Sequence, residues 1–271
     1  MRTGTVRAPT LDRMASLNID RAAPIVIRIY KEESTLEVWK QDRTGRFVLL
    51  NSYPICKFSG ELGPKIAEGD HQAPEGFYEV TPVALNPMSR EYLAFNIGFP
   101  NAFDRSLGRT GSFVMVHGGC ESVGCYAMTD YAMEEIYGLV SEALKGGQNR
   151  IQLEAFPFHM TAQNLARYAQ DRNAPFWAML KKGSDAFLAF GQPPTVAVCD
   201  HRYVFNPAVA IDDLDPSAPC PPDVDATSVA GAGVLSRAAS AIAVPSDEPP
   251  MAYPADDPIA QIINENFREF H

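Results

Sequence analysis

The chain has 271 residues, with 23 Lys or Arg against 33 Asp or Glu, so its formal net charge is −10. This length is enough to bury a sizeable core in one domain. Affinity for nucleic acid depends on clustered positive charge, and the sequence has no block of Lys and Arg. We therefore expect no nucleic-acid partner.

Residues 1–24 are an N-terminal lead-in with no apolar run flanked by basic residues, so no signal peptide or transmembrane span is visible there. The apolar or alternating segments that follow predict structural strands, with a hairpin turn at Thr44-Gly45. These strands are expected at 25–30, 35–39 and 47–50.

Residues 57–76 are rich in Gly and Pro and predict a long loop, a feature that is often functional in compact domains. Four polar side chains of this loop could line a cleft, but we favour solvated turn positions for each of them: Lys65, Glu68, Asp70 and His71. Strands are expected at 76–81 and 92–97, on either side of a turn. Asn101 and Asp104 follow, and they suit turn capping better than substrate positioning.

The segment with the most chemical information combines a histidine, two cysteines and three glycines. It runs Val116-His117-Gly118-Gly119-Cys120-Glu121-Ser122-Val123-Gly124-Cys125-Tyr126-Ala127-Met128-Thr129. Apolar residues 113–116 predict a buried strand before the glycine-rich loop, and Thr129 or Asp130 is expected to cap a helix after it. Such a loop is suited to carry a nucleophile and its base.

A thiol attacks an acyl carbon only as its thiolate, so it needs a base or a positive field nearby. His117 supplies such a base for Cys125 near neutral pH. The backbone N–H groups of Gly124, Cys125 or Tyr126 are candidates for stabilising an oxyanion, and the N-terminus of the following helix is expected to favour the thiolate. Without spatial proof, the pair also fits a buried structural cysteine beside a histidine.

The helix after this loop carries an apolar stripe and is expected to run from Asp130 to Gly146-Gly147. The elements beyond it are expected in this order: a strand at 151–156, helices that begin at Met160-Thr161 and at Pro175, and a last strand at 196–205. Residues 206–271 are predicted as a disordered, Pro- and Ala-rich tail with a short helix around 259–267.

Several blocks of the sequence resemble one family in the same order. The motif around Cys125 resembles the catalytic motif of YkuD-type L,D-transpeptidase domains, and more closely that of the YafK branch of this family. The other similar blocks are Tyr53 to Lys65, Glu68 to Tyr78, and Asn96 to Asp104. Together they cover roughly residues 25–205.

The resemblance implies a mainly β fold with packed helices (α+β), a β-sandwich-like catalytic domain at 25–205. It implies Cys125 as nucleophile and His117 as proton donor and acceptor, with the Gly118 carbonyl orienting the His117 ring. Ser122 is expected to support the loop by hydrogen bonding. Gly124 and Tyr126 are the candidate oxyanion donors, and Asn101 and Gly119 are candidate substrate-binding residues. No cofactor is implied.

Two departures from the wider family bear on the reaction. Many members have a histidine where this chain has Val123 and an arginine where it has Ala127, and the missing cation could otherwise hold a peptide carboxylate. His117 and Cys125 are also only eight positions apart, where a longer intervening loop is common. These departures favour hydrolysis over cross-linking.

The resemblance implies that the substrate is a peptidoglycan stem peptide, from whose diaminopimelate an attached lipoprotein or outer-membrane protein is released. A transpeptidase that forms cross-links or attaches proteins is the alternative activity, and an inactive wall-binding module is the alternative of another class. The resemblance also implies the periplasm, so we expect that a leader precedes Met1 or has been removed.

The five cysteines are an odd number, which is consistent with one reactive thiol in an exported protein. If Cys125 stays reduced, the other four allow two bridges. We expect Cys56 to pair with Cys120, since both lie within the similar blocks, and more weakly Cys199 with Cys220. The sequence has no His-Glu-x-x-His motif, so no metal site is expected.

Overall fold

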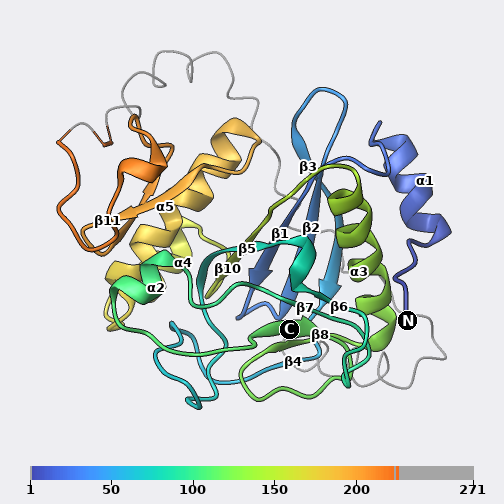
Figure 1. Ribbon diagram of the computed structural model, residues 1–271, viewed down its shortest axis with the longest axis horizontal. Helices are drawn as coiled ribbons and strands as arrows, with labels where there is room; N and C mark the ends of the chain where they lie inside the picture. The colour runs from blue at the N-terminus through green and yellow to red at the C-terminus, as the bar shows by residue number, and fades with distance from the viewer. Residues whose placement is uncertain (1, 223, 226–271) are drawn as a thin grey trace.

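The computed structural model describes residues 2–222 and 224–225 (Figure 1). Two five-stranded sheets carry the fold. The first has the strand order β3 (Phe47–Pro54), β2 (Thr35–Gln41), β1 (Ile25–Tyr30), β10 (Ile151–Phe156), β5 (Gly76–Val80). The second has the order β4 (Lys57–Phe58), β9 (Tyr126–Ala127), β8 (Met115–His117), β7 (Ala94–Asn96), β6 (Leu85–Asn86). A separate hairpin joins β11 (Val196–Cys199) to β12 (Arg202–Phe205).

Each five-stranded sheet contains a single parallel pair, β1 with β10 and β8 with β9, and its other pairs are antiparallel. All six residues of β1 are buried, as expected for a central strand that is covered on both faces. Its one charged residue, Arg28, pairs with Glu154 of β10 at 2.8 Å and donates to Ser184, so the buried charge has partners.

One helix connects the two sheets. α3 (Asp130–Lys145) follows β9 and leads into β10, and it packs against β1 of the first sheet and β7 of the second. Thr129 caps its N-terminus by accepting from the Ala132 N–H at 3.1 Å. Figure 1 shows α3 lying beside both sheets, with α1 (Ala8–Ser16) on its outer side. The apolar stripe of α3 therefore fixes how the second sheet sits on the first.

The later part of the chain covers another side of the first sheet, as Figure 1 shows at the left. Here α5 (Ala174–Phe190) and the β11–β12 hairpin pack through aromatic side chains on the first sheet. Phe77 of β5 meets Tyr203 of β12 and Phe156 of β10 edge-on, at centroid separations of 5.4 and 5.7 Å. The remaining short elements are α2 (Ala102–Ser106), α4 (Ala162–Arg167), η1 (Pro82–Ala84) and η2 (Ile211–Asp213).

The structure confirms the predicted α+β class and corrects several local predictions. The lead-in contains a helix, α1, which begins with a proline in its first turn. The predicted last strand at 196–205 is a hairpin, because Asp200 and His201 both take positive φ, 49° and 53°, and turn the chain back.

Part of the predicted disordered tail is folded. Residues 206–222 and 224–225 lie against the β11–β12 hairpin, where a disulfide joins Cys199 to Cys220 and Val224 is buried. The cross-link and this small apolar cluster supply the ordering that composition alone did not predict. The predicted helix around 259–267 lies outside the described residues.

Within the described part of the chain, no helix has the length and apolar character needed to cross a bilayer.

Candidate active site

The second sheet brings His117 and Cys125 together. β8 and β9 run parallel, with Val116 opposite Tyr126 and His117 opposite Ala127. Cys125 immediately precedes β9 and so lies beside Met115. Because alternate residues of a strand share a face, the side chains of His117 and Cys125 are on the same face, as diagonal neighbours.

The His117 ring is buried and held in one orientation. Its Nδ1 lies 2.6 Å from the Gly118 carbonyl oxygen. A carbonyl only accepts, so Nδ1 carries the proton and Nε2 is left with a free lone pair. This is the tautomer that can take a proton from a neighbouring thiol.

Gly118 itself is fixed by its surroundings. Its N–H donates to the Leu93 carbonyl at 3.1 Å, and a Cβ at this position would come within 2.6 Å of Oδ1 of Asp130. The same Asp130 oxygen accepts the Gly119 N–H at 2.8 Å. The first residue of α3 therefore holds the turn that presents the Gly118 carbonyl to the histidine.

Cys125 is half-buried, and backbone groups lie close to its sulfur. The Met115 N–H donates to its Sγ at 3.4 Å, and Sγ lies 3.8 Å from the Phe113 carbonyl oxygen. Burial raises the pKa of the Cys125 thiol, while the Met115 N–H and the positive charge of Lys65 act to lower it. The resting group is therefore a thiol that needs a base.

Ser122 holds the loop around Cys125. Its Oγ donates to the Cys125 carbonyl at 2.8 Å and receives the Cys125 and Gly124 N–H groups at 3.1 and 3.3 Å. It also accepts from Ser59 at 2.9 Å. The structure supports neither Gly124 nor Cys125 as an oxyanion donor, because both N–H groups are already directed at Ser122. The Tyr126 N–H stays a prediction.

The loop is closed at its base by covalent and backbone contacts. A disulfide joins Cys120 to Cys56, with their Cα atoms 5.3 Å apart, next to the β4–β9 pair. Met128 donates to the His117 carbonyl at 2.7 Å and accepts from the Cys120 N–H at 3.2 Å. These contacts hold the segment between His117 and Met128 as a compact turn.

We expect thiol titration of the unreduced, denatured protein to find a single reactive thiol per chain. All five cysteines lie in the described residues, four of them in the two disulfides, and Cys125 is free. The measurement uses a colorimetric thiol reagent, with the C125A variant as control. Three or more thiols in the parent protein, or any thiol in C125A, would contradict the pairing.

The pH dependence of Cys125 alkylation should follow from its raised pKa. Only the thiolate reacts, and below its pKa the thiolate fraction rises about tenfold for each pH unit. We therefore expect the rate of labelling by iodoacetamide to climb steadily between pH 6 and pH 8. A rate that is already at its plateau at pH 6 would show a preformed thiolate instead.

Three other predictions about the site need correction. Asn101 is not supported as a substrate-binding residue: its Nδ2 donates to the Phe77 carbonyl and to the Tyr203 hydroxyl, both at 2.7 Å, and its Oδ1 caps α2. The Gly119 N–H is likewise taken up by Asp130. Cys125 does not lie directly before α3, because β9 and residues 128–129 separate them, so the thiol is not at the N-terminus of the helix as we expected.

The loop predicted at 57–76 contains one residue that sequence reasoning misjudged. Lys65 is buried, with only 5% of its surface exposed, whereas Glu68 and His71 are exposed as expected. Among residues 2–222 and 224–225, no group of three or more His, Cys, Asp or Glu side chains is arranged to hold a metal ion.

A cysteine and a histidine on one sheet face, with the histidine fixed as a base, define a candidate site for cysteine-dependent acyl transfer. Comparison with known proteins agrees. The family model of the YkuD L,D-transpeptidase catalytic domain matches residues 24–151. The protein named Putative L,D-transpeptidase YafK, from Escherichia coli K12, is 45% identical over 194 residues, which are 72% of this chain and 78% of the relative. The chain belongs to the YkuD L,D-transpeptidase family.

The version of YafK from Escherichia coli O157:H7 matches to the same extent. Solved structures with a more distant likeness include the helical cell shape determining protein Pgp2 from Campylobacter jejuni, with a TM-score of 0.40 and 16% identity over 70% of this chain and 80% of that one. Bd1075 of Bdellovibrio bacteriovorus has a TM-score of 0.36 and 21% identity over 62% of this chain and 65% of that one.

Proposed function

We propose that this protein is a cysteine-dependent amidase of peptidoglycan. It acts at meso-diaminopimelate and releases a covalently attached lipoprotein or outer-membrane protein. The observation that carries the proposal is the hydrogen bond from Nδ1 of His117 to the Gly118 carbonyl, which leaves Nε2 as a base on the face that Cys125 shares. The family membership supplies the substrate class.

The first half of the reaction makes a thioester. Nε2 of His117 takes the Sγ proton, and the sulfur attacks the amide carbonyl carbon at diaminopimelate. The carbon–nitrogen bond then breaks, and the His117 proton goes to the leaving amine of the attached protein.

Water completes the reaction in the amidase. His117 removes a proton from the water that attacks the thioester, the carbon–sulfur bond breaks, and the proton returns to Cys125. Ala127 supports hydrolysis over transfer. It is fully buried beside His117 in the sheet register, and the cation that many family members have at this position is absent. A site without that cation is less suited to hold the carboxylate of a second stem peptide.

We place the protein in the periplasm. The substrate lies there, and the two disulfides are of the kind that persist in an oxidising compartment.

The test uses muropeptides that carry a lipoprotein-derived peptide on diaminopimelate, incubated in ¹⁸O-labelled water and analysed by mass spectrometry. We expect release of the peptide and one ¹⁸O atom in the new carboxylate, with neither product in C125A. New cross-linked products without ¹⁸O would establish the transferase instead. No product that depends on Cys125 would leave only a wall-binding role.

A further inference from the structure

The segment from Lys65 to Gln72 borders the nucleophile on two sides. A Cβ on Gly124, the residue before Cys125, would lie 3.8–3.9 Å from backbone atoms of His71 and Gln72. A Cβ on Gly111 would lie 2.8 Å from Cε of Lys65, and Gly111 is two residues before Phe113, whose carbonyl faces the thiol. The loop therefore lies against both segments that flank the thiol, the one at Gly124 and the one at residues 111–113.

An ion pair between Lys65 and Asp70 helps to hold this loop. Nζ of Lys65 donates to the Ala67 carbonyl at 2.9 Å and forms a salt bridge with Asp70. Asp70 also accepts the N–H groups of Ile66, Ala67 and Gln72 at 2.8–3.0 Å. These donors lower the pKa of Asp70 to about 2, although burial opposes them. The carboxylate stays ionised, and the ammonium is pinned beneath the loop.

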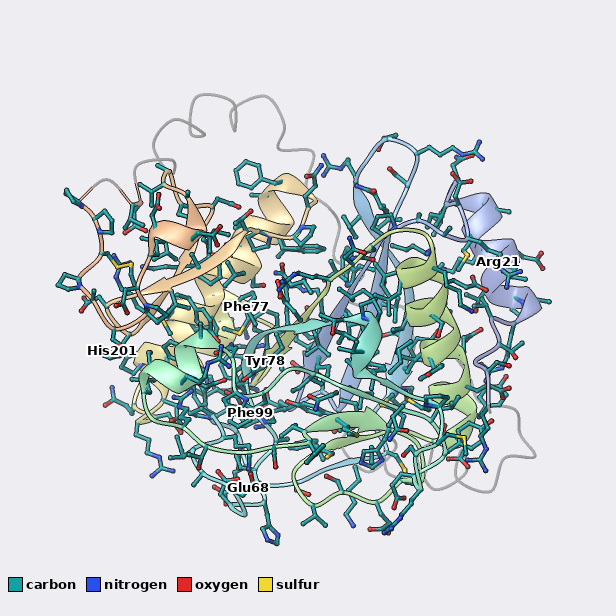
Figure 2. The ribbon with its side chains drawn as sticks, in the orientation of Figure 1. Arg21, Glu68, Phe77, Tyr78, Phe99 and His201 are labelled. Carbon is teal, nitrogen blue, oxygen red and sulfur yellow. A yellow bond between two sulfur atoms is a disulfide. The ribbon has the colours of Figure 1, made fainter. Side chains whose placement is uncertain are left out.

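The position of Lys65 suits an electrostatic role better than direct contact with substrate. The side chain is buried, its Nζ lies 5.9 Å from the centre of the Phe99 ring, and two of its three donors are used. Figure 2 labels Phe99 and Glu68, which lie in the same lower region of the molecule, where Glu68 extends outward from the loop. A charge held among apolar groups acts over a longer range than one in water.

We propose that Lys65 is the positioning residue that supplies positive charge to this site and favours the thiolate of Cys125. The inference rests on the proposed function only in taking Cys125 as the nucleophile. Other ionisable groups near the site come from several segments: His117 in β8, Glu121 in the turn before Cys125, Asp130 at the start of α3, Glu91, and Glu68, Asp70 and His71 in the loop. Burial raises the pKa of Cys125, and the positive charge of Lys65 acts in the opposite direction.

The test measures the rate of Cys125 alkylation by iodoacetamide against pH, which requires no substrate. At pH 7 we expect K65M to react roughly three- to tenfold more slowly than the parent protein, with its profile displaced to higher pH. K65R, which keeps the charge, should stay within about twofold of the parent. K57M is the matched control, since Lys57 is an exposed lysine in β4 whose ion pair with Glu121 contributes little.

A fourth variant separates charge from loop structure. D70N removes the counter-charge of Lys65, so an electrostatic role predicts alkylation as fast as in the parent protein or faster. If the ion pair only stabilised the loop, D70N would slow alkylation as K65M does, and the proposal would be wrong. An unchanged rate in folded K65M would also overturn it. Product analysis tests the proposed function separately. If the K65M profile shifts as expected but the parent protein releases no lipoprotein, the proposed function is rejected and the role of Lys65 stands.

Discussion

Replacement of His117 by asparagine is expected to slow release of the attached peptide by about 10²–10⁴-fold, the usual contribution of a general base. The substitution removes the group that we propose takes the Cys125 proton and later gives it to the leaving amine. Burial raises the pKa of that thiol, so the reaction has little thiolate to start from near neutral pH. The measurement is the initial rate of release on lipoprotein-linked muropeptides.

The H71N variant is the matched control for H117N. His71 is exposed at the tip of the neighbouring loop with a φ of 55°, a conformation that asparagine tolerates well. Its rate should stay close to that of the parent protein. Thermal unfolding of both variants checks that the fold is intact. A folded H117N protein with more than a tenth of the parent activity would remove His117 from the mechanism.

The sequence was sufficient to predict that His117 and Cys125 lie close together at the candidate site, because the motif places them within a few positions. His117, Cys125 and the glycines between them point to a tight loop by residue type alone. What could not be predicted is the contribution of groups without a sequence signal. The Met115 N–H that faces Sγ is a backbone amide, and any residue at that position would supply it.

Lys65 shows a second limit. A lysine in a loop rich in Gly and Pro is ordinarily solvated, and its burial depends on Asp70 and on the close approach of Gly111. These contacts arise only when the loop folds against a segment more than 40 residues later in the chain. Gly124 was misjudged for a similar reason, since the orientation of its N–H toward Ser122 is set by the loop and not by residue type.

The fold was predictable where periodicity was strong. The apolar run of β1 and the stripe of α3 gave the correct element and nearly the correct ends, because both elements bury a continuous face. The β11–β12 hairpin was missed because Asp200 and His201 interrupt an apolar run too briefly to indicate a turn. Here the left-handed conformation of two non-glycine residues, not the composition, ends one strand and begins the next.

A second large effect is expected on stability, from the K31M variant. Lys31 follows β1 and is fully buried, and its Nζ donates to the carbonyls of Glu61, Gly63 and Ala73 and to Glu75 at 2.7–3.1 Å. Methionine would leave the Glu75 carboxylate in the interior without its cation. Breaking a buried pair in this way costs about 3–5 kcal/mol, so we expect a loss of that size in the free energy of unfolding.

The cause can be tested by neutralising the carboxylate as well. Glu75 also accepts from the Trp177 indole N–H at 2.8 Å and from the Gly63 N–H at 2.6 Å, and a glutamine can keep one of these two bonds through its amide oxygen. The double variant K31M/E75Q should therefore be more stable than K31M alone, because it has no unpaired buried charge. Urea unfolding of the full chain measures both. K181M, which breaks an exposed helical pair with Asp185, is the control and should lose no more than about 0.5 kcal/mol.

The outcome bears on the active site, because Lys31 and Glu75 hold the loop that also contains Lys65. Glu75 accepts the Gly63 N–H, and the neighbouring Pro74 carbonyl accepts the hydroxyl of Tyr126, the residue after the nucleophile. If the buried pair anchors this loop, K31M should also alter the rate of Cys125 alkylation. The double variant K31M/E75Q should recover part of the parent rate. A K31M protein with parent-like stability and an unchanged alkylation rate would show that the loop is held by its other contacts.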